Sequence, residues 1–152
     1  MRGRRWRARS DGFLDATTEV KVRFHEVDAM GVVWHGHYLA YFEQARVAFG
    51  DRYGLDYMTI LREGYVAPIV RVEVEHLRPV RFTETLTVRA RLHPEAGARI
   101  VFAYRAENRA GEEVANGLSW QAFTDLGGAL SLTRPAFYER WLERWEAEFR
   151  TA

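Results

Sequence analysis

The sequence contains no cysteine among its 152 residues. This absence excludes disulfide bridges, a thiolate nucleophile and cysteine-ligated metal sites. It also fits a reducing cytoplasm, where we expect the protein to be located. No apolar run approaches the roughly 20 residues that a membrane-spanning helix requires, so we expect no membrane partner.

The chain has no internal repeat and no low-complexity linker. Its length and its 47% content of hydrophobic residues predict one domain with a sizeable core. The net charge of +1 is unevenly distributed, because five arginines lie in the first nine residues. Without these five, 17 of the 22 basic residues remain against 21 acidic ones, and this mildly acidic balance argues against a nucleic-acid partner.

The arginine-rich start shows neither a helical nor a strand period. We expect residues 1–15 to form a disordered basic tail and residues 16–152 to form the single domain. A nucleic-acid tether and an organelle transit peptide are the alternative interpretations of this tail.

Alternating apolar and polar residues predict five strands with one buried face each. The first strand covers residues 17–24, with Val20, Val22 and Phe24 on the buried face. The other four strands are predicted over residues 69–77, 84–92, 99–107 and 113–125. Short connections between consecutive strands predict that they pair antiparallel.

Two helices complete the predicted order. The first covers residues 36–53 and is apolar enough to need cover on most sides, and Gly54 is a suitable residue to end it. The second begins at Thr133 and repeats an aromatic residue every four positions, a stripe that packs either on its own domain or on another subunit. This order of elements predicts an α+β fold, in which a curved antiparallel sheet wraps around a long central helix.

An acid, a tight turn and a helix start lie within ten residues, at Asp28, His35 and Gly36. The first N–H groups of a helix lack intrahelical partners and carry the positive end of its dipole. A carbonyl oxygen placed there would be polarised, and Asp28 would supply a base or nucleophile. Such a stretch is suited to acyl transfer. The plainer alternatives are that Asp28 only forms a turn and that His35 only packs beside Trp34.

The histidines near this stretch raise the possibility of zinc. His25, His35 and His37 lie in sequence near Glu26 and Asp28, and all are possible ligands. Residues two apart do not share a helix face, and the chain contains no H-x-x-x-H pair, so we expect no metal site. Glu43, two turns into the helix, is expected to be a buried, paired carboxylate rather than a second acid of the site.

The same stretch follows the pattern D-x-x-G-x-V-[YFW]-[HY]-x-x-Y-[LF]-x-[WFY]-[FL]-[ED]. The matching residues are Asp28, Gly31, Val33, Trp34, His35, Tyr38, Leu39, Tyr41, Phe42 and Glu43. It resembles the signature of hotdog-fold acyl-CoA thioesterases, in the branch of 4-hydroxybenzoyl-CoA thioesterase and the Tol–Pal-associated short-chain acyl-CoA thioesterase. Residues 70–92 resemble later strands of that family. The chain departs at Gly36, where the family commonly has Ala or Pro, and at His37, where it commonly has Asn.

The resemblance implies a hotdog fold and a catalytic Asp28, which acts as nucleophile or as general base on water. It implies that backbone N–H groups near His35 and Gly36 hold the thioester carbonyl and that coenzyme A, as part of the substrate, is the only cofactor-like group. It also implies homodimers or homotetramers with sites at the subunit boundary. The substrate-binding candidates are Gly31, Trp34, His37, Tyr38, Arg78, Arg81 and Arg99, with the arginines assigned to the coenzyme A phosphates.

The expected function is hydrolysis of a short-chain or aryl acyl-CoA to the free acid and coenzyme A. A thioesterase for acyl-carrier protein is one alternative, although a mildly acidic domain is a poor match for an acidic carrier. A non-catalytic acyl-CoA-binding protein is another, and the intact Asp28–Gly31–His35 arrangement argues against it. Tyr57, Met58 and Tyr65 are candidates for lining the acyl pocket, but core packing explains them equally well.

Overall fold

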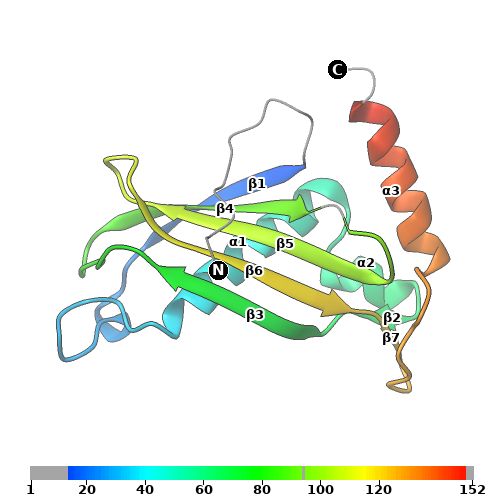
Figure 1. Cartoon of the computed structure of the whole chain (residues 1–152), viewed down its shortest axis with the longest axis horizontal. Helices are drawn as coiled ribbons and strands as arrows, with labels where there is room; N and C mark the ends of the chain where they lie inside the picture. The colour runs from blue at the N-terminus through cyan, green and yellow to red at the C-terminus, as the bar shows by residue number, and fades with distance from the viewer. Residues whose placement is uncertain (1–13, 94, 150–152) are drawn as a thin grey trace.

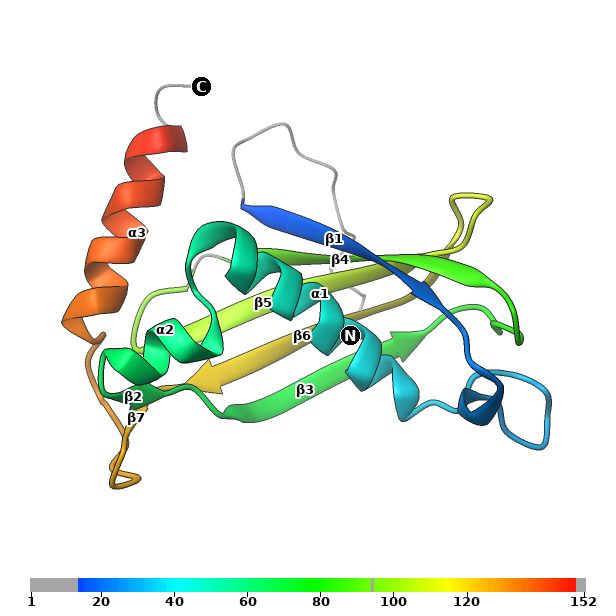
Figure 2. The same ribbon diagram turned by 180° about the vertical axis from the view of Figure 1, so that it is seen from behind.

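The computed structural model describes residues 14–93 and 95–149. A five-stranded antiparallel sheet carries one long helix across one face and a second helix at one end (Figures 1 and 2). The large sheet contains β1 (Asp15–Lys21), β3 (Ile69–His76), β4 (Thr85–His93), β5 (Arg99–Glu107) and β6 (Glu113–Ala122). The helices are α1 (His37–Tyr53), α2 (Tyr57–Arg62) and α3 (Ala136–Phe149). The smaller elements are the 3-10 turn η1 (Phe24–Glu26) and the paired short strands β2 (Tyr65–Val66) and β7 (Thr124–Asp125).

The tail predicted over residues 1–15 lies outside the described residues except at its end. Leu14 is buried in the core, and β1 begins at Asp15. The first strand therefore starts and ends slightly earlier than predicted. Phe24, predicted to lie on its buried face, is 76% exposed because the chain leaves the strand after Lys21 and turns into η1.

The central helix is confirmed. It ends at Gly54, which adopts the left-handed conformation at φ 70° and donates its N–H to the carbonyl of Gly50. Its buried side packs on the sheet, where the Phe42 ring stacks on Tyr104 with centroids 4.7 Å apart. No described element covers the opposite side (Figure 2), and Glu43 is exposed, so the expectation that it is buried is wrong.

The strand order is β1-β4-β5-β6-β3. Pairing of consecutive strands is confirmed for β4, β5 and β6 but is wrong for β3 and β4, which lie apart. The link between them does not form a hairpin, because Val80 is fully buried and its carbonyl accepts the N–H of Val33 at 2.8 Å. Consequently β3 becomes an edge strand, paired only with β6 among the described strands.

Strand β6 turns its small and polar residues toward α1. A Cβ added to Gly117 would lie 2.7 Å from the Phe42 ring, so glycine allows the close approach of helix and sheet. The buried Ser119 hydroxyl bonds the Tyr104 hydroxyl at 2.8 Å, and the Gln121 amide donates to the Ala67 carbonyl at 2.7 Å. These bonds satisfy polar groups that would otherwise be costly to bury.

The terminal helix packs within its own chain. The Trp141 indole N–H donates to the Tyr53 carbonyl at 2.7 Å, and Tyr138 packs on Phe123 with ring centroids 5.1 Å apart. Of the two alternatives for its aromatic stripe, packing on its own domain is the one observed for these residues. The sheet wrapped around α1 confirms the expected α+β hotdog fold.

Candidate active site

A tight hairpin over residues 26–34 joins η1 to the start of α1. The Trp34 N–H donates to the Glu26 carbonyl and the Asp28 N–H to the Val32 carbonyl, each at 2.9 Å. At its tip Gly31 adopts φ +75°, a conformation that residues with side chains rarely take. These two backbone hydrogen bonds fix the chain on both sides of Asp28.

The Asp28 side chain is half-buried, and one of its oxygens has a structural role. Oδ1 accepts the N–H of Met30 at 2.8 Å, so Asp28 does form a turn. The second oxygen has no hydrogen-bond partner in the part of the chain that the structure describes. The turn therefore orients the carboxylate and leaves one oxygen available for chemistry.

The hairpin leads directly into unpaired N–H groups. Within the described residues, the N–H groups of His35 and Gly36 donate to no carbonyl, whereas that of His37 donates to Trp34 at 3.0 Å. The Trp34 ring lies against the backbone of Gly36, and a Cβ at that position would overlap the ring carbons. The indole ring thus forms a wall beside the two free donors.

A ring of aromatic side chains surrounds the start of α1. The Trp34 ring lies 4.8 Å from that of His35 and 5.5 Å from that of His37. The buried Tyr38 ring contacts His76 edge-to-face at 4.9 Å. Burial, and then the nearby Glu84 carboxylate, raise the pKa of Tyr38 to about 12, so this phenol is protonated at neutral pH.

His76 is a residue of this ring that the sequence analysis did not include in the site. It comes from β3, 41 positions after His35, so no local spacing connects the two. Side chains alternate along β3, so Val72, Val74 and His76 share the side that faces α1. This alternation is the sequence signal that could have placed His76 near the helix.

The three candidate arginines lie in different places. Arg81 forms a β-bridge with Val32, and its Nη1 lies 3.8 Å from the position of a Cβ on Gly31. Arg78 is ion-paired with Glu112 at 3.2 Å.

Arg99 is ion-paired with Glu95 at the start of β5. The other end of β5, at Ala106, is the end that lies level with His76, since both pair with Ala115. With about 3.3 Å per strand residue, Arg99 is some 20 Å or more from the start of α1. Of the three arginines, the structure therefore brings only Arg81 to the hairpin.

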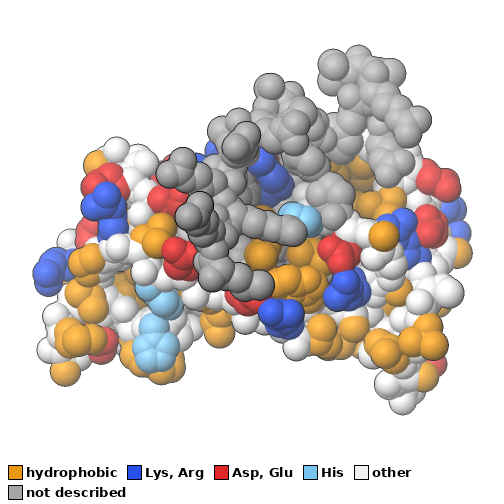
Figure 3. Space-filling view, viewed as in Figure 1, with side chains coloured by type: hydrophobic (Ala, Val, Ile, Leu, Met, Phe, Trp, Pro, Cys, Tyr) orange, Lys and Arg blue, Asp and Glu red, His pale blue; other side chains and the backbone are white. Residues whose placement is uncertain are grey.

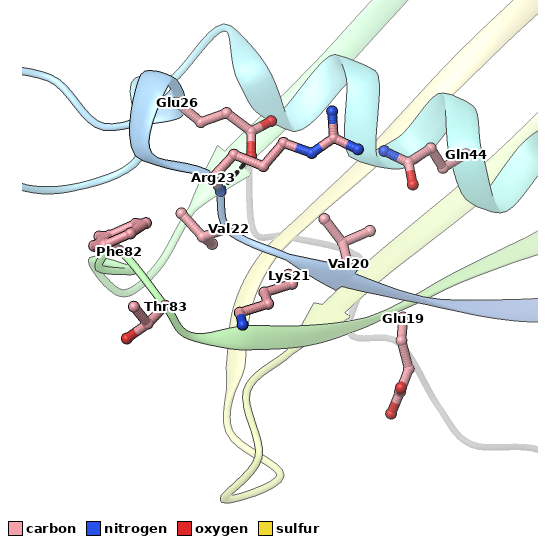
Figure 4. A pocket seen from close by; sticks show the side chains of 9 residues that line it. All are labelled: Glu19, Val20, Lys21, Val22, Arg23, Glu26, Gln44, Phe82 and Thr83. Atoms are coloured by element: carbon pink, nitrogen blue, oxygen red, sulfur yellow. Dashed lines mark hydrogen bonds between the residues drawn. The ribbon is translucent and has the colours of Figure 1, made fainter.

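A cavity of about 410 Å³ opens beside the hairpin, between β1 and α1 (Figure 4). Arg23, Glu26 and Gln44 point toward one another inside it. Glu26 is buried and accepts the Arg23 N–H at 2.7 Å. Burial, and then the Glu26 carboxylate, raise the pKa of Tyr41 on α1 above its usual range. The buried Glu26 carboxylate thus lies at the base of the hairpin and near the helix.

Residues 14–93 and 95–149 contain neither a cluster of metal ligands nor a helix that could span a membrane. In this range no three histidine, aspartate or glutamate side chains are grouped so that they could hold a metal ion. None of the helices in it is long and apolar enough to cross a membrane.

A family model described as the thioesterase-like superfamily matches residues 22–144. The Bacillus subtilis protein YneP, provisionally named an acyl-CoA thioesterase, is 32% identical over 94 residues, which cover 62% of this chain and 68% of YneP. Two further curated relatives are matched over only 51% and 66% of their length.

Two solved structures superpose on this chain. The hypothetical protein TT1821 of Thermus thermophilus does so with a TM-score of 0.76 and 34% identity, covering 86% of this chain and 98% of that one. The DHNA-CoA thioesterase of Staphylococcus aureus has a TM-score of 0.75 at 22% identity, covering 90% and 89%, and shows the shared fold.

Proposed function

The chain belongs to the thioesterase-like superfamily, and from this we propose that it is an acyl-CoA thioesterase. It would convert an acyl-CoA and water into the free acid and coenzyme A. One observation carries the proposal. The hairpin bears Asp28, with one carboxylate oxygen free, and continues into the unpaired N–H groups of His35 and Gly36.

The proposed chemistry uses these groups in two ways. Asp28 either attacks the thioester carbonyl carbon or removes a proton from the attacking water. The carbonyl oxygen gains negative charge as the bond to the carbon forms, and the free N–H groups stabilise this charge by about 3 kcal/mol per donor. The coenzyme A thiolate then leaves and takes up a proton. Where Asp28 has attacked, water hydrolyses the resulting acyl anhydride, which releases the free acid and restores the Asp28 carboxylate.

The surrounding side chains have proposed binding roles. The rings of Trp34, His37 and Tyr38 lie around the start of α1, so these side chains would line the acyl group. The proposed acyl group is short or aromatic. Arg81 would meet a coenzyme A phosphate beside the hairpin. Arg78 is engaged by Glu112, and Arg99 would reach a bound coenzyme A only across a subunit boundary.

We propose that two copies associate through β3 and the uncovered side of α1. The free edge of β3 offers unpaired backbone groups to a second strand, and Val70 beside them is 62% exposed. On α1, Leu39 and Val47 are 45% and 54% exposed. No described element covers one side of this helix (Figure 2). A second copy would cover these apolar groups, and a tetramer would require two such dimers.

A panel of acyl-CoA substrates tests the function. Free thiol is followed with a thiol-detecting reagent, and each acyl group is scored by kcat/KM on coenzyme A and on acyl-carrier protein. We expect turnover of coenzyme A thioesters, with short-chain or aryl groups preferred. Hydrolysis of the carrier-bound group alone would identify a carrier-protein thioesterase, and tight binding of coenzyme A without turnover would identify a non-catalytic binder. Either result contradicts the proposal.

The proposed reaction needs only protein groups and water. Exhaustive dialysis against a chelator should therefore leave kcat and KM unchanged. A loss of turnover that added zinc restores would show that a metal ion takes part.

A further inference from the structure

His76 lies at the end of β3, on the side of the strand that faces α1. It pairs with Ala115, two residues along β6 from Gly117, against which Phe42 of α1 packs. Its ring centroid is 4.9 Å from that of Tyr38 and 6.4 Å from that of His35. Histidine side chains gather on the surface at this end of the molecule, where α1 begins (Figure 3).

The imidazole of His76 has no structural hydrogen bond. Among the described residues neither ring nitrogen has a donor or acceptor partner. A residue that only packed on the Tyr38 ring would need no nitrogen, since phenylalanine would serve equally well. The ring centroid lies 6.4 Å from that of His35, whose backbone N–H is unpaired among the described residues, as is that of Gly36.

The surroundings favour the neutral form of this imidazole. Partial burial, and then the nearby His35, hold the pKa of His76 below its usual range. The positive end of the α1 dipole acts in the same direction. A neutral imidazole has one N–H to donate, and such a group can polarise a substrate carbonyl beside a helix start.

We propose that His76 donates a hydrogen bond from β3 to the thioester carbonyl oxygen that the N–H groups of His35 and Gly36 bind from α1. It is then a third donor of the oxyanion site and a catalytic residue, which neither the family resemblance nor the comparisons assign. The inference rests on the proposed function of the same site. It makes the site a composite of two elements that are far apart in the sequence.

Two substitutions separate hydrogen bonding from packing. His76→Phe keeps a ring against Tyr38 and removes the donor, whereas His76→Gln keeps a donor and removes the ring. We expect His76→Phe to lower kcat by roughly tenfold to a hundredfold with a smaller change in KM, and His76→Gln to retain more activity. Glu75→Gln, on the opposite face of the same strand, is the matched control and should match the wild type. The reverse order, with Phe active and Gln impaired, would show a packing role and overturn the proposal.

A binding experiment tests the contact without requiring turnover. One coenzyme A analogue replaces the thioester sulfur by CH₂ and keeps the carbonyl, and a second is a thioether that lacks the carbonyl. His76→Phe should weaken binding of the ketone by roughly tenfold, measured by calorimetry, and leave the thioether unchanged. Equal effects on both analogues would overturn the proposal. If His76→Phe weakens binding of the ketone alone but the wild type hydrolyses no acyl-CoA, the contact stands and the proposed function fails.

Discussion

The Trp34 ring explains why this chain has glycine at position 36. The indole lies against the Gly36 backbone, and any Cβ there would overlap it. The resembling family commonly has Ala or Pro at this position. In this chain Gly36 and Trp34 form a matched pair beside the proposed oxyanion donors.

We predict that Gly36→Ala displaces the Trp34 ring. Since Trp34 is 47% exposed, the ring can swing outward, and the free energy of unfolding should change by less than about 1 kcal/mol. Turnover should fall by about threefold to tenfold, because the wall beside the donors moves. A double-mutant cycle with Trp34→Ala checks this by measuring kcat/KM. Gly36→Ala should have no further effect in the Trp34→Ala background, and an unchanged effect there would refute the pairing.

Thr83 is a second residue with an unusual backbone. It adopts φ +73°, which is strained for a β-branched side chain, at the edge of the cavity in Figure 4. We predict that Thr83→Gly stabilises the fold by up to about 1 kcal/mol, because relief of strain outweighs the added freedom of the unfolded chain. Thermal unfolding measures the change, with Thr85→Gly in β4 as the destabilising control. A lower Tm for Thr83→Gly would contradict this reading of the strain.

At the level of elements, the contact between α1 and β6 depends on Gly117. A Cβ there would lie 2.7 Å from the Phe42 ring and 2.5 Å from the Glu73 carbonyl oxygen. We predict that Gly117→Ala lowers the free energy of unfolding by about 1–3 kcal/mol through overpacking, as measured by urea denaturation. Gly127→Ala, in an exposed turn, should change it by less than about 0.5 kcal/mol. Equal stability of the two variants would show that the helix can move away from the sheet at little cost.

Local periodicity predicted the elements better than their arrangement. The central helix and β5 were correctly located because their apolar residues repeat over many positions. The short α2 was missed, although Asp56 at its start accepts the N–H of Thr59 as an N-cap does. The separation of β3 from β4 depends on the burial of Val80, a tertiary contact that the strand pattern does not encode.

The candidate site was predictable only where it is continuous in the sequence. Asp28, His35 and Gly36 belong to one hairpin and helix start, so their proximity follows from their spacing. His76 reaches them only through the sheet topology. Sequence spacing could not exclude Arg99 from the site. Its distance from the site depends on which end of β5 lies near the start of α1.

At the level of the whole molecule, the described part of the chain leaves one side of the central helix bare. We predict that Val70→Lys on β3 and Leu39→Lys on α1 each shift the protein from dimer to monomer and lower turnover. Analytical ultracentrifugation measures the mass, with kcat/KM followed in the same samples. Leu126→Lys is the control, because Leu126 is similarly exposed, at 65%, but lies beside β7. A wild type that is monomeric and fully active would contradict the subunit-boundary site.

The most direct test of the proposed thioesterase is the rate of coenzyme A release by Asp28→Asn. The amide retains the size of the side chain and an oxygen for the Met30 N–H but can act neither as nucleophile nor as base. We predict that kcat falls by at least about a hundredfold relative to the wild type, while Asp125→Asn in β7, which likewise keeps an oxygen for a backbone N–H, that of Ala129, has no effect. Turnover by Asp28→Asn within about threefold of the wild-type rate would contradict the assignment of Asp28 and the mechanism built on it.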